Sequence, residues 1–189
     1  MADPTLFGIG KSEWDLFHGF ANWFSAVASV GAAVVALYIA NRSARPTGRV
    51  SAGHRISIGQ GSRPPYPEYA VLSFVNTGDR PIRVTQIGWT VGFFRKRSAV
   101  QFFDVALSSK LPIDLSHGQE AAWYVPLNVN PDPWPESFAT KMLLPNYRAS
   151  LWTLKVQAYS SVGYSFEAVP EEGLVRRLRE ACERHSSKS

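Results

Sequence analysis

A run of 21 residues without a charged side chain, residues 20–40, constrains most what this chain can fold into. An α-helix rises about 1.5 Å per residue, so such a run covers the roughly 30 Å hydrocarbon core of a bilayer. Trp14, Trp23 and Tyr38 lie near its ends, where membrane proteins place aromatic residues. We therefore expect a helix from about Glu13 to Arg42 that crosses a membrane once, with its span over about 20–40.

Two other kinds of segment share this apolar character. A buried helix of a soluble protein would need a large core around it, whereas the rest of the chain has the pattern of a single β-domain. A secretory signal peptide begins with basic residues and has an apolar core of about 7–15 residues. Here the first 19 residues carry a net side-chain charge of −2, and the apolar run is longer. We expect an uncleaved anchor.

The charges that flank the run predict its orientation. Arg42, Arg45 and Arg49 follow it closely, and only Lys11 precedes it closely. An excess of Lys and Arg marks the cytoplasmic side, so we expect the N-terminus outside and residues 41–189 in the cytoplasm. The only cysteine, Cys182, excludes a disulfide scaffold and suits a reducing compartment.

Small residues recur at helical spacing along the span. One row holds Ser25, Ser29 and Ala33, and another holds Ala28, Ala32 and Ala36. Such rows let helices approach closely, which predicts a homo-oligomer formed through the span. An alanine-rich helix that simply faces lipid has the same composition and stays an alternative.

After residues 45–48, which end the helix, the period of the sequence changes to that of strands. Seven runs rich in β-branched and aromatic residues are separated by Gly, Pro, Asn and Asp, at 49–58, 69–75, 81–94, 98–106, 119–127, 151–160 and 164–169. Strands at this spacing without intervening helices predict a mainly β fold, an antiparallel β-sandwich or small barrel. A short helix at 136–144 is expected to cap one end of the sheet.

The C-terminal segment has a helical pattern. Apolar side chains fall on one face of residues 170–185, and charged ones on the other; the apolar set is Leu174, Val175, Leu178, Ala181 and Cys182. We expect an amphipathic helix that packs on the sheet, although it would also suit a partner or a membrane surface. The predicted organisation is an anchor segment (1–45), a β-domain (46–169), and a C-terminal helix and tail (170–189).

No pattern in the sequence predicts catalytic, cofactor-binding or metal-ligating residues. Gly10, Lys11 and Ser12 resemble the end of a phosphate-binding loop, but the earlier glycine of that motif is replaced by Thr5 and no strand precedes it. The four histidines, at positions 18, 54, 117 and 185, lie in separate segments without metal-ligand spacing. Carboxylates from different strands can still meet in space, so an enzyme stays a third possibility.

The densest basic feature follows the long run at 81–94. Phe93, Phe94, Arg95, Lys96 and Arg97 are expected to form a hairpin tip, and a solvated turn is the simplest interpretation of it. The alternative is a contact with lipid or a partner, because an anionic membrane surface attracts Lys and Arg. Nucleic-acid binding would call for a wider basic stripe with exposed aromatic residues, so we do not expect a nucleic-acid partner.

Several strand and turn sequences look familiar when taken together: residues 69–78, the Ile87-Gly88-Trp89 segment, and residues 111–120. They resemble uncharacterised bacterial and phage-borne proteins that have one N-terminal membrane span and an immunoglobulin-like β-sandwich, over residues 20–170. The resemblance implies that Gly78 and Gly88 serve backbone geometry. It supplies no catalytic residue.

These observations predict a membrane-anchored, non-enzymatic binding or scaffold protein with an unknown protein partner. The rival hypothesis is a membrane-disrupting effector of a bacterial defence or toxin system, in which the β-domain senses a signal and the helices oligomerise. The small-residue rows and Asn22, near the outer end of the span, suggest that rival.

Overall fold

The N-terminal unit of the chain is a single long helix. The computed structural model describes residues 11–43, 45–59, 63–129 and 131–187, and the chain divides after Arg45 into two compact units. Helix α1 covers Lys11–Ser43. Its stretch Asn22–Asn41 has a mean hydropathy of 1.9, is not buried by the rest of the chain, and is long enough to cross a membrane. This confirms an apolar N-terminal helix, whose length and composition a signal sequence or a core helix would share.

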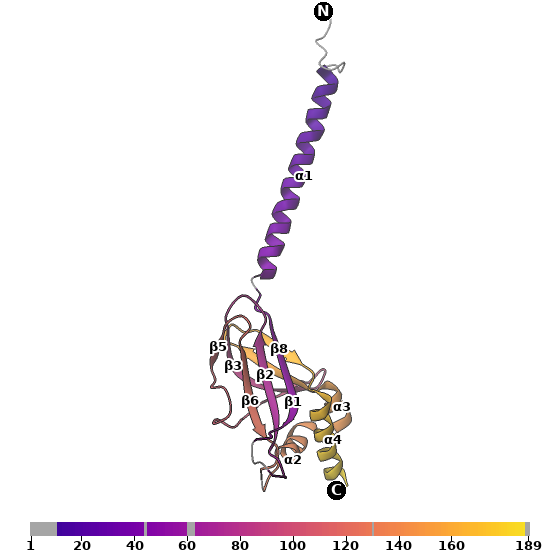
Figure 1. Ribbon diagram of the computed structural model, residues 1–189. Helices are drawn as coiled ribbons and strands as arrows, with labels where there is room; N and C mark the ends of the chain where they lie inside the picture. Colours follow the sequence, from indigo (N-terminus) through magenta and orange to yellow (C-terminus); the bar gives the residue numbers. More distant parts are fainter. Residues whose placement is uncertain (1–10, 44, 60–62, 130, 188–189) are drawn as a thin grey trace, which may run out of the picture. The chain divides into compact units, whose positions relative to one another are not determined.

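The second unit contains two antiparallel sheets (Figure 1). The first sheet has the order β1-β2-β6, with β1 over Gly48–Ile56, β2 over Glu68–Asn76 and β6 over Glu120–Pro126. The second has the order β4-β3-β7-β8, with β4 over Arg97–Val100, β3 over Ile82–Val91, β7 over Lys155–Ser160 and β8 over Ser165–Ala168. Strand β5, Ile113–Leu115, pairs with the start of β3.

The burial of each strand follows its sequence pattern. In β2 every second residue is buried, because successive side chains of a strand point to opposite faces of the sheet. In β3 the inward positions change from Ile82 and Val84 to Ile87 and Trp89. The register with β7 shifts between Val84 and Gln86, and the extra residue of such a bulge exchanges the two faces.

Three short helical segments and one longer helix make the second unit a mixed fold rather than a mainly β one. They are α2 (Trp134–Phe138), the π-helical turn η1 (Ala139–Leu143), α3 (Tyr147–Thr153) and α4 (Glu172–Ser186). The apolar side chains of α4 are buried: Leu174, Leu178, Ala181 and Cys182. Burial raises the pKa of the Cys182 thiol, aided by the negative charge of Glu183, so this cysteine is a small core residue.

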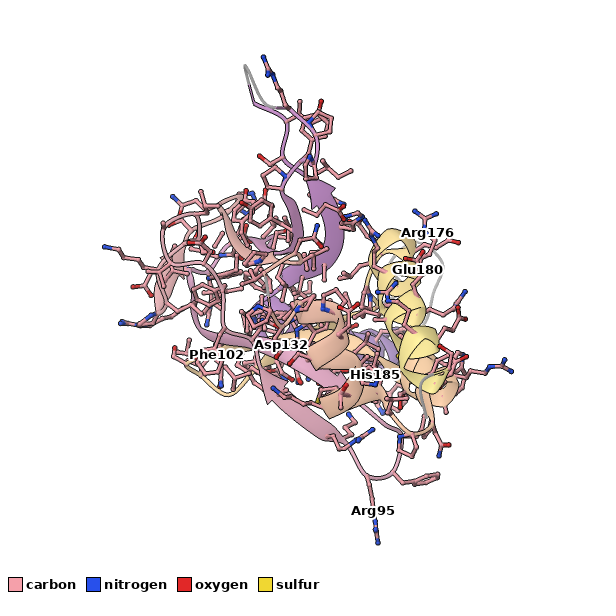
Figure 2. All side chains as sticks on the ribbon, turned by 90° about the horizontal axis from the view of Figure 1, so that it is seen from below. Arg95, Phe102, Asp132, Arg176, Glu180 and His185 are labelled. Carbon is pink, nitrogen blue, oxygen red and sulfur yellow. The ribbon has the colours of Figure 1, made fainter. Side chains whose placement is uncertain are left out.

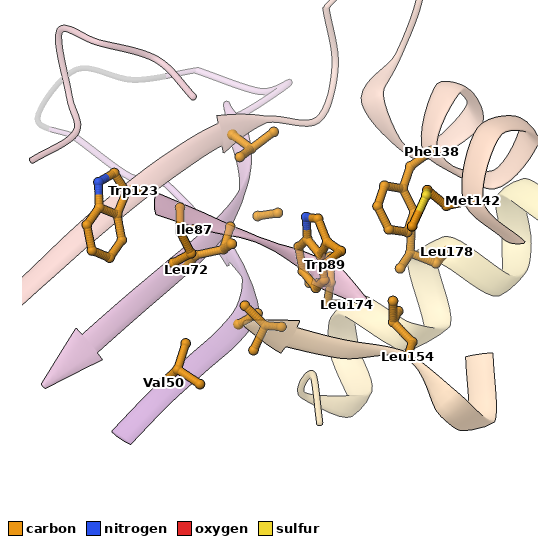
Figure 3. Packing of buried hydrophobic residues seen from close by; sticks show 14 of the residues in the cluster. Val50, Leu72, Ile87, Trp89, Trp123, Phe138, Met142, Leu154, Leu174 and Leu178 are labelled. Carbon is orange, nitrogen blue, oxygen red and sulfur yellow. The ribbon is translucent and has the colours of Figure 1, made fainter. Parts of the chain in front are cut away.

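The core is continuous between the two sheets and the helices (Figure 3). Val50, Leu72 and Trp123 come from the first sheet, and Ile87 and Trp89 from the second. The helical segments add Phe138, Met142, Leu174 and Leu178, together with Leu154, which follows α3. The two tryptophans are 0% and 1% exposed, so they are the largest side chains removed from water.

Three of the predicted strands differ from the structure. The run at 98–106 stays in the sheet only to Val100, because the chain then crosses to the other sheet, where the amide of Asp104 donates to the carbonyl of Tyr124 at 2.8 Å. The run at 151–160 begins inside α3, whose Leu151 is buried three residues before buried Leu154. The run at 81–94 ends at Val91, and strand β5 was not anticipated.

The strand pairings define two ends of the second unit. At the entry end, Gly48 pairs with Asn76, Ile82 with Leu115, and the turn that follows Ser160 joins β7 to β8. At the far end, Ile56 pairs with Glu68 and Val91 with Arg97. Strand β3 runs from the entry end to the far end in 10 residues, which at about 3.3 Å each separates the two ends by roughly 30 Å.

Candidate functional site

The Phe93–Arg97 segment predicted to be a hairpin tip is the connection between β3 and β4 at the far end. Gly92 begins it with φ +105°, and a Cβ there would lie 2.6 Å from the carbonyl oxygen of Arg95, so the turn needs glycine. Phe93 and Phe94 are 72% and 97% exposed. Large aromatic side chains are seldom left so open to water, which makes this turn a candidate interaction surface.

A third exposed aromatic residue, Trp152 of α3, lies beside the turn. It is 79% exposed, and its ring is parallel to that of Phe93, with an interplanar angle of 8° and centroids 6.4 Å apart. The sequence reasoning missed Trp152 because residues 151–160 were assigned to a strand. The asparagine at 146, directly before α3, is a usual helix-start residue and was the signal available.

The basic residues of the turn differ in how they are paired. Lys96 Nζ lies 3.9 Å from Glu167 Oε1, and Lys155 Nζ lies 2.9 Å from Glu167 Oε2. For Arg95 and Arg97 no ion pair is found within the described part of the chain. Arg95 projects away from the ribbon (Figure 2). Phe93, Phe94, Trp152, Arg95 and Arg97 together are called the far-end patch below.

Buried polar side chains fix the base of this patch. The hydroxyl of Thr90 donates to Gln157 Oε1 at 2.5 Å, and Gln157 Nε2 donates to Glu167 Oε1 at 3.2 Å. The amide of Gly92 donates to the hydroxyl of Thr153 at 3.0 Å, which ties the turn to the end of α3. The exposed rings therefore stand on a rigid support, which lowers the entropy lost when a partner binds.

Two grooves open on either side of Trp152. One of about 340 Å³ is bounded by Phe93, Lys96, Lys155 and Glu167. The other, of about 610 Å³, lies against α3 and α4 and includes Tyr147, Arg148, Val175 and Arg179. Apolar walls with a few charged side chains at the margin are the usual composition of a site that receives a partner's side chains.

The small residues predicted to pack between helices lie on α1. Ser25, Ser29, Ala33, Ala28, Ala32 and Ala36 are all exposed, and the hydroxyl of Ser29 donates to the carbonyl of Ser25 at 2.8 Å. A Cβ built on Gly31 would meet nothing within 4 Å. Among the described residues, this surface of α1 is open in a single chain.

Several titratable side chains meet where α4 contacts the first sheet. His54 Nε2 lies 2.8 Å from Glu68 Oε2, and Arg177 also donates to that carboxylate. Burial acts to raise the pKa of Glu68, but hydrogen bonds from Arg177 and His54 outweigh it and hold this pKa below its ordinary value. These contacts fasten a helix to a sheet.

A second contact on the same face has the same role. Arg55 donates to both carboxylate oxygens of Glu171 at 2.6 and 2.7 Å, and these hydrogen bonds lower the pKa of Glu171. Among the described residues, no group of three His, Cys, Asp or Glu side chains is placed to hold a metal ion. Gly10 and the side chain of His18 lie outside the described part.

The two buried tryptophans, Trp89 and Trp123, differ in their hydrogen bonds. Trp89 Nε1 donates to Gln101 Oε1 at 2.7 Å, and Trp134 Nε1 donates to the same oxygen at 3.2 Å. Trp123 Nε1 is buried and has no hydrogen-bond partner among the residues that the structure describes. The Gln101 amide is therefore the polar centre of an aromatic cluster that includes Phe138, which supports the fold rather than a reaction.

The two glycines singled out by the resemblance are confined by close backbone approaches. A Cβ on Gly88 would lie 2.2 Å from the carbonyl oxygen of Ala99 on β4. A Cβ on Gly78 would lie 2.5 Å from the hydroxyl of Thr47. Both positions leave little room for a side chain.

Comparisons with known proteins give little beyond this geometry. No protein-family model and no curated protein matches the chain. A crystal structure of a protein described as ApaA from Bordetella pertussis aligns with 65% of this chain and 87% of that chain, at 17% identity and a TM-score of 0.29. A similarity of that size carries no argument about fold or function.

Proposed function

We propose that this chain is a membrane-anchored, non-enzymatic binding protein that presents its far-end patch to a protein partner. The observation that carries the proposal is the patch itself. Three exposed aromatic rings and two arginines without ion pairs among the described residues gather on one rigid end of the β-domain. Trp, Tyr and Arg dominate the binding energy of protein interfaces, and Phe is enriched there as well.

The anchor in this proposal is α1. The stretch Asn22–Asn41 has the length and apolar character of a span, and no side chain of the chain as described covers it. Arg42, Arg45 and Arg49 follow it, which favours a cytoplasmic β-domain and an outer N-terminus in a bacterial inner membrane. Tags at the two ends, probed with protease in spheroplasts, test this: only the N-terminal tag should be cleaved.

The strand orders support an immunoglobulin-like sandwich as the scaffold. The order β1-β2-β6 matches strands A, B and E of that fold, and β4-β3-β7-β8 matches an extended C, F and G sheet. Hydrogen-bond ladders that join both β1 to β8 and β6 to β4 would instead close the two sheets into a small barrel.

The partner's chemistry follows from the charges of the patch. Arg95 and Arg97 favour an acidic segment, and the grooves beside Trp152 have room for an apolar side chain. Glu167 lies among the lysines and breaks any continuous basic stripe, which argues against a nucleic-acid strand.

Photocrosslinking in cells tests the proposal. p-Benzoylphenylalanine in place of Phe94 should form an adduct with one protein, and Arg95→Glu with Arg97→Glu should abolish that adduct. Phe102 is the matched control, because it is 86% exposed but lies away from Arg95 (Figure 2). Equal adducts from both positions, no adduct, or an adduct sensitive to ribonuclease would contradict the proposed partner.

The rival function, a membrane-disrupting effector, rests on the open small-residue surface of α1. An effector of this kind depolarises the inner membrane when induced or stimulated. Measurement of membrane potential with a voltage-sensitive dye separates the two proposals, because a binding protein leaves the potential unchanged.

A further inference from the structure

We propose that the entry end of the β-domain contacts the surface of the bilayer through the turn between β7 and β8. This inference rests on the proposed span in α1 and goes beyond it by naming the surface that meets lipid. The Phe93–Arg97 turn, for which the sequence suggested a lipid contact, is left to the protein partner.

The length of the connecting chain keeps the entry end near the membrane. The apolar stretch ends at Asn41, and β1 begins at Gly48. Seven residue steps extend at most roughly 25 Å, so Gly48 is tethered within that distance of the end of the span. The far-end patch is separated from Gly48 by the length of β3, about 30 Å.

The β7–β8 turn at the entry end exposes apolar side chains. Val162 is 69% exposed and Tyr164 is 46% exposed. Gly163 lies between them with φ +82°, which a side-chain-bearing residue seldom adopts. Valine at a protruding tip, followed by tyrosine, has the amphipathic character of residues found at the boundary between membrane and water.

Hydrogen bonds make this turn rigid. The amide of Ser160 donates to the carbonyl of Tyr164 at 2.9 Å, and the amide of Gly163 donates to the carbonyl of Ser160 at 3.2 Å. The amide of Ser161 donates to the carbonyl of Arg83 at 3.0 Å, which joins the turn to β3. Because the tip is already ordered, its insertion into the interface requires little additional loss of entropy.

The charges around the turn cancel one another. Arg49 and Arg80 are exposed and have no ion pair within the described residues. The acids Asp79 and Asp114 are each near a basic group, at 4.0 Å from His117 and 3.8 Å from Arg83. Glu120 is a further acid near these arginines, and it has no ion pair among the described residues. The three arginines and the three acids named here balance, so the apolar tip rather than charge gives the contact.

Environment-sensitive labelling of the full chain tests the contact. In a Cys182→Ala background, a single cysteine is placed at Val162 or, as the matched control, at Phe94, and each is labelled with the fluorophore NBD. The chain is reconstituted in vesicles of phosphatidylcholine and phosphatidylglycerol. We expect a blue shift of NBD emission at position 162, with quenching by nitroxide-labelled lipid, and neither effect at position 94.

Two outcomes overturn the inference: no shift at position 162, or equal shifts at both positions, which would mean that the domain lies flat on the bilayer. A second label at Tyr164→Cys guards against a local effect of the first substitution. Extraction at alkaline pH tests the anchor separately. A chain released by carbonate refutes the span itself, whereas a chain that is retained without a shift refutes only the contact.

Discussion

Replacement of Gln101 by leucine should destabilise the β-domain through hydrogen bonds alone. Gln101 is 7% exposed, and its Oε1 accepts from the indole nitrogens of both Trp89 and Trp134. Leucine is of similar size, so packing changes little, but both indole N–H groups lose their acceptor. The substitution therefore measures what one buried side-chain amide contributes to the free energy of unfolding.

The magnitude follows from the burial of the two rings. Trp89 is 1% exposed, so its N–H finds neither water nor another partner, which costs about 1–3 kcal/mol. Trp134 is only partly buried, and its N–H can turn to water with little loss. We expect a loss of about 2 kcal/mol in the free energy of unfolding, which lowers the urea midpoint by about 1 M.

Urea denaturation of the full chain in detergent micelles measures this loss, with near-UV circular dichroism reporting the buried tryptophans. Gln86→Leu is the control, because Gln86 is half-buried on β3 and makes no side-chain hydrogen bond among the described residues. Its effect should stay within about 0.5 kcal/mol. If the two variants unfold at the same midpoint, the amide does not stabilise the tryptophan pair and the reasoning is refuted.

Three further results are expected. Gly88→Ala should cost at least about 2 kcal/mol, because its Cβ would lie 2.2 Å from a backbone oxygen, whereas Gly173→Ala on α4, with its nearest atom at 3.8 Å, should be neutral or stabilising in the same urea assay. The pKa of Glu68 is lowered in the folded state, so the stability that Glu68 contributes is complete above its ordinary pKa of 4.5 and is lost as pH falls below that value. Glu68→Gln should therefore flatten the acid limb of a stability–pH profile, and an unchanged acid limb would contradict the role of this carboxylate. Ser29→Leu combined with Ala33→Leu should reduce the amount of crosslinked dimer in membranes, while Val27→Leu on the opposite helix face should leave it unchanged. Equal amounts of dimer in the wild type, the double variant and the control variant would exclude packing through this row.

The far-end patch illustrates what joins residues that are distant in sequence. Phe93 and Phe94 were identified from the sequence because they stand next to three basic residues. Trp152 completes the patch from 58 positions further along the chain, brought there by α3 and by the hydrogen bond between the Gly92 amide and Thr153. A local pattern cannot reveal such a meeting, because the packing of an α-helix against a strand end decides it.

The sequence by itself determined the features that depend on local periodicity. The charge-free run made α1 apolar, alternation placed β2 and β6, and the glycine and asparagine residues of the turns ended the strands. These features are local because hydrophobic period and backbone preference act over a few neighbouring residues. Tertiary structure alone decided where β4 leaves its sheet and where α3 interrupts a strand-like run.

Tertiary structure also decided which turns share an end of the domain. The sequence allowed a lipid contact for the Phe93–Arg97 turn, but the strand pairings put this turn roughly 30 Å from Gly48, where the chain enters the domain. The β7–β8 turn, unremarked in the sequence, lies at the entry end instead. Strand direction and register set these positions, and both arise from contacts between residues far apart in the chain.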